Sequence, residues 1–210
     1  MENVLSIIFC LSLFYVAVTS RVKAYVTVLR AQGLILAVLL MLPFLYHFSI
    51  FGIILPVTLL LVKVYLIPRY INKVILDLDI KRRIEPVIQQ MIFLPLVIAS
   101  MIIIFLASNI LSKSTELTVI PFASGFSAII VGIYIIMFRK KLIVHVCGFL
   151  ILENGIFLFG TSVASQMPMM IELGMLLDVF VVVFLMGIAL NRISNTFEGF
   201  EVTHLGRLKD

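Results

Sequence analysis

Six ionisable side chains interrupt the long apolar runs of this chain, and they are the residues in it that could do chemistry. Such groups are costly in hydrocarbon, so inside a membrane span they usually face a bundle interior or a water path. Glu153 and Asn154 stand side by side in the apolar run HVCGFLILENGIFLFG. The six ionisable residues are Arg30, Lys63, His145, Glu153, Glu172 and Asp178.

Two carboxyl groups are expected at nearly the same depth. Glu153 lies 12 residues beyond Lys141, and Asp178 lies 14 residues before Arg192. At the rise of an α-helix these separations are about 18 Å and about 21 Å from one membrane edge. A carboxyl group in low dielectric favours its neutral form, and two neighbouring ones titrate as a coupled pair. The predicted chemistry is therefore proton transfer within the lipid.

Further polar groups extend this pair into a ladder. Glu172 lies about 9 Å further out than Asp178, and His145 lies about 12 Å below Glu153. Asn154 can hydrogen-bond a neighbouring carboxyl group or an interrupted backbone carbonyl. The spacing predicts a path that runs from His145 through the two deep carboxyl groups to Glu172.

Each candidate also has a structural interpretation. An interfacial position would account for Glu172 and for His145. Arg30 and Lys63 lie within two turns of a membrane edge, so snorkelling would explain them. The two deep carboxyl groups have side chains too short to snorkel, and their structural alternative is a hydrogen bond between helices.

The elements that carry these residues are membrane helices. Of 210 residues, 62% are hydrophobic and 13% are charged, with a mean hydropathy of +1.22, whereas soluble domains average about 25% charged residues. The net charge of +5 falls in short clusters between apolar runs. That pattern is typical of membrane orientation and not of nucleic-acid binding. We expect an all-α integral membrane protein with no nucleic-acid partner.

Seven apolar segments approach the length of about 20 residues that a span requires. The third is followed by a charged connector, IPRYINKVILDLDIKRRIEP, whose start can continue the helix beyond the lipid. The predicted spans are 3–20, 25–46, 50–68, 88–111, 118–138, 142–161 and 168–191.

The basic residues predict the orientation of these spans. Thirteen of the 16 Lys and Arg lie in alternate connections, and the opposite connections carry only Lys113. The positive-inside rule therefore places the N-terminus outside and the C-terminus in the cytoplasm. We divide the chain into a four-helix membrane region, 1–111, a three-helix membrane region, 112–192, and a cytoplasmic tail, 193–210.

No cofactor, metal site or catalytic residue is expected. Cys10 and Cys147 lie in separate spans without the spacing of a metal site or a disulfide framework. The chain has no Gly-rich phosphate loop, nucleophile elbow or His-rich motif. Small apolar packing is the expected role of both cysteines.

The C-terminal third resembles a known family. The run RKKLIVHVCGFLILENGIFLFG, then MPMMIELGMLLDVFVVVFLMGIALNRI and the tail FEGFEVTHLGRLKD resemble component E of hydrogenase-4 and its relatives in membrane-bound group 4 nickel–iron hydrogenases. The C-terminal half of that family is similar to the small K subunit of respiratory complex I. It is also similar to the C subunit of multi-subunit sodium/proton antiporters. The resemblance covers residues 139–210.

This resemblance implies a multi-pass subunit in a prokaryotic cell membrane that helps carry protons or sodium across the lipid. Its partners would be antiporter-like and quinone-site-like membrane subunits, with electrons carried by nickel–iron and iron–sulfur subunits. Glu153 and Asp178 would be the two intramembrane carboxylates. One departure is that the position of the first glutamate of the complex I subunit is Leu150 here, and Glu153 lies about 4.5 Å further along the axis. The alternatives are a redox-free antiporter subunit and a purely structural spacer.

Overall fold

The apolar runs form helices, since a segment in lipid must satisfy each backbone N–H and C=O group internally. The computed structural model describes residues 1–42, 56–77, 90–113 and 118–163, with Phe180, Val181, Phe184 and Gly187. The elements in this part of the chain are all helical: α1 (Glu2–Val18), α2 (Val22–Met41), the π-helix η2 (Leu60–Leu66), α4 (Ile67–Asp77), α5 (Gln90–Leu111), α6 (Val119–Phe138) and α7 (Leu142–Val163).

Four helices in the described residues are long and apolar enough to cross a membrane: Val22–Met41, Met91–Leu111, Val119–Phe138 and Leu142–Val163. Each begins and ends within a few residues of a predicted span, except that α2 is shorter at its end. The apolar helix α1 has 17 residues and falls below that length. The predicted span 168–191 lies almost wholly outside the described residues. The described residues are thus all-helical with four candidate membrane spans, and these helices do not support the predicted count of seven or the predicted orientation.

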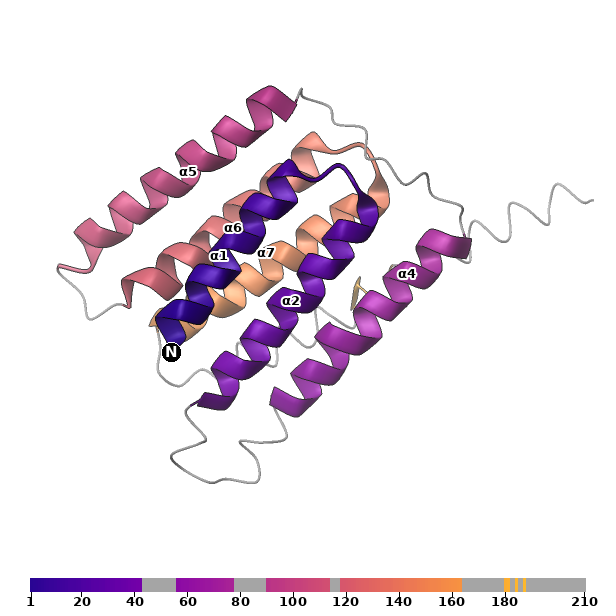
Figure 1. Ribbon diagram of the computed structural model, residues 1–210, viewed down its shortest axis with the longest axis horizontal. Helices are drawn as coiled ribbons and strands as arrows, with labels where there is room; N and C mark the ends of the chain where they lie inside the picture. The colour runs from indigo at the N-terminus through magenta and orange to yellow at the C-terminus, as the bar shows by residue number, and fades with distance from the viewer. Residues whose placement is uncertain are drawn as a thin grey trace, which may run out of the picture.

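The helices lie roughly side by side, with α4 and α5 at opposite flanks of the bundle (Figure 1). In its most apolar stretch, α7 has 67% of its residues buried, against 28% for α5. Helix α7 packs on both α6 and α2, and α1 packs on α2 and α6. The residues of α7 are therefore central in the bundle, where polar side chains must find partners within the protein.

Four glycines bring α6 and α7 into backbone contact. A Cβ atom added to Gly125 would lie 2.5 Å from the backbone nitrogen of Phe159, and one added to Gly132 would lie 2.7 Å from the carbonyl oxygen of Gly148. A Cβ added to Gly155 would meet the Gly125 carbonyl oxygen at 2.7 Å. These contacts run in antiparallel order, and Gly148 and Gly155 permit the close approach of the two helices.

The charged connector does continue the third helix, as expected. Helical backbone runs from residue 56 to residue 77, through η2 and then α4. We call the starts of α2, α5 and α7, with the ends of α4 and α6, the basic end of the bundle. The guanidinium of Arg139 lies over the ring of Phe93 there, which joins the end of α6 to the start of α5.

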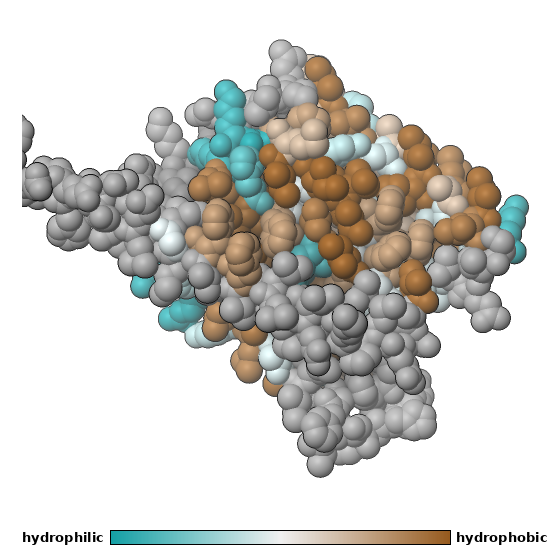
Figure 2. All heavy atoms as spheres, turned by 180° about the vertical axis from the view of Figure 1, so that it is seen from behind, coloured by the Kyte–Doolittle hydropathy of each residue, from teal (hydrophilic) through white to brown (hydrophobic). Residues whose placement is uncertain are grey.

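The outer surface is mostly apolar. Figure 2 shows a broad hydrophobic face, with hydrophilic residues mainly towards its margins. On α5 alone, Ile102, Ile103, Leu106 and Ile110 are each at least 55% exposed. A surface of this kind suits contact with lipid or with apolar partner helices and not with water.

Candidate functional site

Glu153 is paired with a lysine from a distant part of the sequence. The Lys63 ammonium donates a hydrogen bond to Glu153 Oε1 at 2.8 Å, and the side chains are 6% and 2% exposed. A buried charge is tolerated when it is paired and hydrogen-bonded. This ion pair is the structural reason that a glutamate can stand in the middle of an apolar run.

Asn154 extends the ion pair into a longer chain of hydrogen bonds. Its Oδ1 accepts from Lys63 Nζ at 3.0 Å, and its Nδ2 donates to Gln32 Oε1 at 3.2 Å. Gln32 Nε2 then donates to Ser12 Oγ at 2.9 Å. Ser12 Oγ in turn donates to the carbonyl of Phe9 at 2.6 Å. We call Ser12, Gln32, Lys63, Glu153 and Asn154 the polar chain.

Apart from the bond that Lys63 donates to Glu153, the hydrogen bonds of the polar chain run in one direction, from Lys63 towards α1. Ser12 uses its hydroxyl hydrogen on Phe9 and offers a lone pair to the Gln32 amide nitrogen. That contact turns the Gln32 oxygen towards Asn154, which turns the Asn154 oxygen towards Lys63. Amide groups do not titrate, so Lys63 and Glu153 are the groups of this chain that can change charge. The remaining members orient the ammonium.

The polar chain crosses the bundle near the middle of its helices. Glu153 is the twelfth of 22 residues in α7, Gln32 the eleventh of 20 in α2, and Ser12 the eleventh of 17 in α1. Glu153 and Gln32 are thus about 15 Å from either end of their helices, while Ser12 is about 15 Å from the start of α1 and about 9 Å from its end. The site lies where a lipid bilayer would be driest.

Two local features place Lys63 against α7. Lys63 lies in the π-helix η2, a conformation that is rare and that frequently marks functional positions. A Cβ atom added to Gly33 would lie 3.0 Å from Lys63 Cβ, so this glycine lets η2 approach α2 closely. On α7, Glu153 and Asn154 are turned roughly 100–160° from Gly148 and Gly155, the glycines that face α6. They therefore face η2 and α2.

Sequence reasoning missed the partnership of Lys63 for an identifiable reason. The snorkelling interpretation placed the membrane edge at Arg69, just after the predicted span 50–68. That interpretation is wrong, because the Lys63 side chain is buried. The helix continues to Asp77, which puts Lys63 about 21 Å from the basic end, close to the depth of Glu153. Gln32 and Ser12 were not singled out, although a glutamine in the middle of an apolar span is itself a signal.

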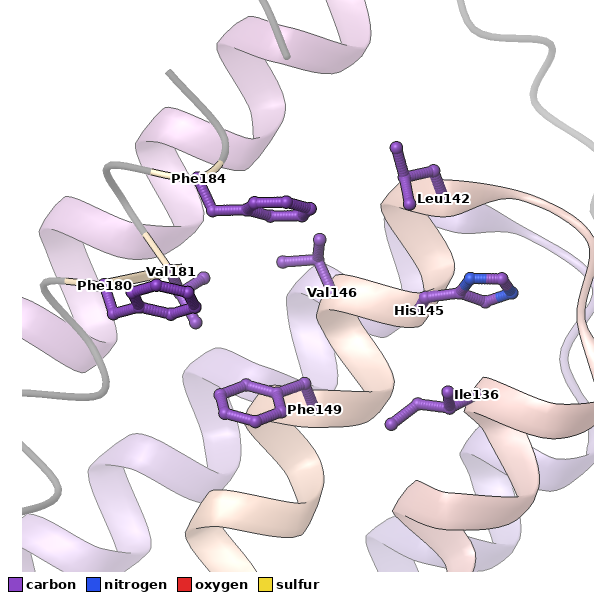
Figure 3. A pocket seen from close by; sticks show the side chains of 8 residues that line it. All are labelled: Ile136, Leu142, His145, Val146, Phe149, Phe180, Val181 and Phe184. Atoms are coloured by element: carbon purple, nitrogen blue, oxygen red, sulfur yellow. The ribbon is translucent and has the colours of Figure 1, made fainter. Parts of the chain in front are cut away.

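His145 does not extend the site as expected. Its Nε2 hydrogen-bonds the backbone carbonyl of Arg139, and since a carbonyl only accepts, this nitrogen carries the proton. Figure 3 shows the His145 ring turned away from Phe180 and Phe184, across an apolar cavity of about 250 Å³. The histidine thus holds the turn between α6 and α7.

The other predicted site residues lie elsewhere. Arg30 is exposed on α2 and lines a cavity with residues of α4. Asp178 and Glu172 lie outside the described residues, so their roles in an ion path stay predictions, as do the division at residues 111 and 112 and the tail 193–210.

A second charge is buried at the basic end. Arg139 is 2% exposed, and none of its guanidinium nitrogens makes a hydrogen bond within the described part of the chain. It lies 4.8 Å from the centre of the Phe93 ring and within electrostatic reach of the fully buried Tyr25 phenol. Sequence reasoning had counted Arg139 only among the orientation charges.

The residues that the structure describes include no cluster of the kind that binds a metal ion. Within them no three His, Cys, Asp or Glu side chains gather in a group. Cys10 and Cys147 are free thiols, 8% and 0% exposed, on different helices. Both side chains are part of the buried core, which confirms their packing role.

Comparisons with known proteins identify no family. No family model matches the chain, and no solved structure matches it. A segment of 87 residues is 26% identical to an uncharacterized protein of Mycobacterium tuberculosis, Rv0085. That segment is 41% of this chain and 40% of the relative, so the likeness covers less than half of either protein.

Proposed function

We propose that this chain is a membrane subunit of a hydrogenase-related energy-coupling complex and that it contributes a charged site to proton or sodium translocation. Electron transfer would take place in other subunits, with antiporter-like membrane subunits as neighbours. The resemblance of residues 139–210 to the hydrogenase-4 component E family suggests the complex. The observation that carries the ion-translocation part is the buried Lys63–Glu153 pair halfway along the helices.

The pair has two states that differ by one proton or cation. In the first, the ammonium and the carboxylate attract each other across 2.8 Å. A proton or cation that arrives at Glu153 removes that attraction, and Asn154 Oδ1, at 3.0 Å, remains as a partner of Lys63. The positive charge of Lys63 is then available to repel the next ion along a path. A change of this kind in low dielectric is felt over a longer distance than in water.

The test is ion movement in vesicles that contain the assembled complex. We expect Glu153→Gln and Lys63→Met each to lower electron-transfer-driven proton or sodium uptake by at least tenfold, because each removes one of the two titratable groups. Gln32→Leu is the matched control, since it disturbs the same polar chain but leaves both titratable groups.

Three outcomes separate the candidates. Selective loss in the pair variants, with the complex assembled, supports translocation. Unchanged uptake in both pair variants, or an equal loss in Gln32→Leu, leaves the polar chain with a structural role only. Ion exchange that proceeds without any redox partner points to an antiporter subunit, the second candidate, which the same buried pair would serve.

We further propose seven spans with the N-terminus outside and the C-terminus in the cytoplasm. The clustering of Arg and Lys at the basic end supports this orientation. In a background of Cys10→Ser and Cys147→Ser, Lys140→Cys should react with an impermeant thiol reagent only from the cytoplasmic side. Lys113→Cys should react only from outside, and the reverse pattern would contradict the proposed orientation.

A further inference from the structure

A cavity lies between α2 and α4 at the basic end of the bundle. It encloses about 350 Å³, and its walls are Lys23, Val26, Thr27 and Arg30 from α2 with Asn72 and Leu76 from α4. Lys23, Thr27 and Arg30 are exposed, so the cavity opens to the surface. Its volume is of the size that small-molecule groups occupy in proteins.

The described residues that line this cavity include two cations and no acid. Lys23 and Arg30 lie seven residues apart and therefore point to the same side of α2. Neither makes an ion pair with any residue that the structure describes. Thr27, between them, donates its hydroxyl hydrogen to the Lys23 carbonyl at 3.2 Å, and Asn72 adds an amide from the opposite wall. Two positive charges with polar neighbours, and with no acid among the described residues of the lining, favour an anion.

The same side of α2 changes character beyond Arg30. Leu34 and Met41 continue the stripe of Lys23 and Arg30, and they are 50% and 41% exposed. Along one stripe the surface therefore passes from two cations to exposed apolar side chains, over about 27 Å of helix. A free anion would use only the first half of such a stripe. A phospholipid, with a phosphate at one end and acyl chains at the other, matches all of it.

The depth of the cavity agrees with a lipid headgroup. Lys23 lies in the first turn of α2, and Arg30 lies about 10 Å further along the axis. Asn72 is five residues from the end of α4 at Asp77. The cavity thus occupies the outer part of the helices, the level of phosphate and glycerol groups when apolar helices cross a bilayer. Basic pockets between membrane helices are known to hold anionic headgroups.

We propose that the α2–α4 cavity binds the phosphate headgroup of an anionic phospholipid, with Lys23 and Arg30 contacting the phosphate and the acyl chains lying along Leu34 and Met41. This inference needs only that the helices lie in lipid, and it does not depend on ion translocation.

The experiment measures lipid retention by the full chain. Purified protein in neutral detergent is titrated with phosphatidylglycerol or phosphatidylcholine, and bound lipid is counted by native mass spectrometry. We expect phosphatidylglycerol to bind at least tenfold more tightly than phosphatidylcholine, and Lys23→Gln/Arg30→Gln to abolish most of that preference. The control Lys73→Gln/Lys140→Gln removes two exposed charges at the same end of the bundle but outside the cavity. This control should keep the preference for phosphatidylglycerol.

Several results would overturn the proposal. One is equal binding of both lipids, and another is an unchanged preference in the Lys23/Arg30 double variant. A loss of preference as large in the Lys73/Lys140 control would mean that net charge and not the cavity selects the lipid. If millimolar inorganic phosphate displaces phosphatidylglycerol, the site is one for a free anion. Failure to displace it supports the lipid.

Discussion

Removing Lys63 should destabilise the bundle far more than a surface substitution does. Lys63→Met leaves the Glu153 carboxylate buried, at 2% exposure, without its cation. Breaking a buried pair by removing one partner costs about 3–5 kcal/mol, because an uncompensated charge remains in low dielectric. For a chain of this size each kcal/mol corresponds to about 2–4 °C, so we expect the unfolding midpoint to fall by roughly 6–20 °C.

The double variant distinguishes the contribution of the ion pair to stability from the contribution of side-chain packing. Lys63→Met/Glu153→Gln removes both charges and keeps side chains of similar volume, and such replacements are often close to neutral. We therefore expect it to be more stable than either single variant. The effects of the two substitutions on the free energy of unfolding would then deviate from additivity by about 3 kcal/mol. This value is towards the high end of the interaction energies measured for residues in contact.

The chain carries its own probe for this measurement. Cys10 and Cys147 are free and buried, 8% and 0% exposed, so a thiol-reactive fluorophore reports unfolding as they become accessible. The variants are heated in one detergent at one protein concentration. Lys140→Met, at an exposed position of the α6–α7 turn, is the control and should shift the midpoint by less than about 2 °C. Single variants that behave like this control, or effects that simply add in the double variant, would refute the reasoning.

Three further predictions use the same unfolding assay. Gly132→Ala should lower stability by about 1–3 kcal/mol, because its Cβ would lie 2.7 Å from a backbone oxygen of α7. Gly187→Ala, which meets no atom of the described residues within 4 Å, should not. Gln32→Leu should lower the free energy of unfolding by about 1–3 kcal/mol, since it leaves the buried amide nitrogen of Asn154 without its hydrogen-bond acceptor. An unchanged midpoint would mean that the polar chain does not contribute to stability. Arg139→Met should lower stability by about 1–2 kcal/mol, because it removes the cation–π contact of the guanidinium with the Phe93 ring at 4.8 Å; an unchanged or higher midpoint would contradict that account.

Much of the helical architecture could be predicted from local sequence. A continuous apolar run long enough to cross lipid satisfies its backbone hydrogen bonds internally as an α-helix. Helices α5, α6 and α7 therefore begin and end close to the predicted positions. Gly148 and Gly155, seven residues apart, share one face of a helix, and their role in close packing follows from that spacing. The importance of Glu153 and Asn154 also followed from sequence, since polar groups at that depth must have partners.

The identity of those partners could not be predicted in the same way. Depth places a residue along a helix axis but says nothing about which neighbouring helix it faces. Lys63 and Glu153 are 90 residues apart, and their contact depends on the π-helix at Leu60–Leu66 and on the close approach at Gly33. Arg139 illustrates the same limit, because a charge in a basic turn was expected at the surface and is buried.

The sequence by itself determined that this chain consists of apolar helices and that Glu153 and Asn154 lie deep among them, because hydrophobicity and helical rise are local properties. Only the tertiary structure decided that the deep glutamate meets a lysine and that a glutamine and a serine complete the chain. Those contacts arise from helix rotation and packing, which depend on every neighbouring helix at once.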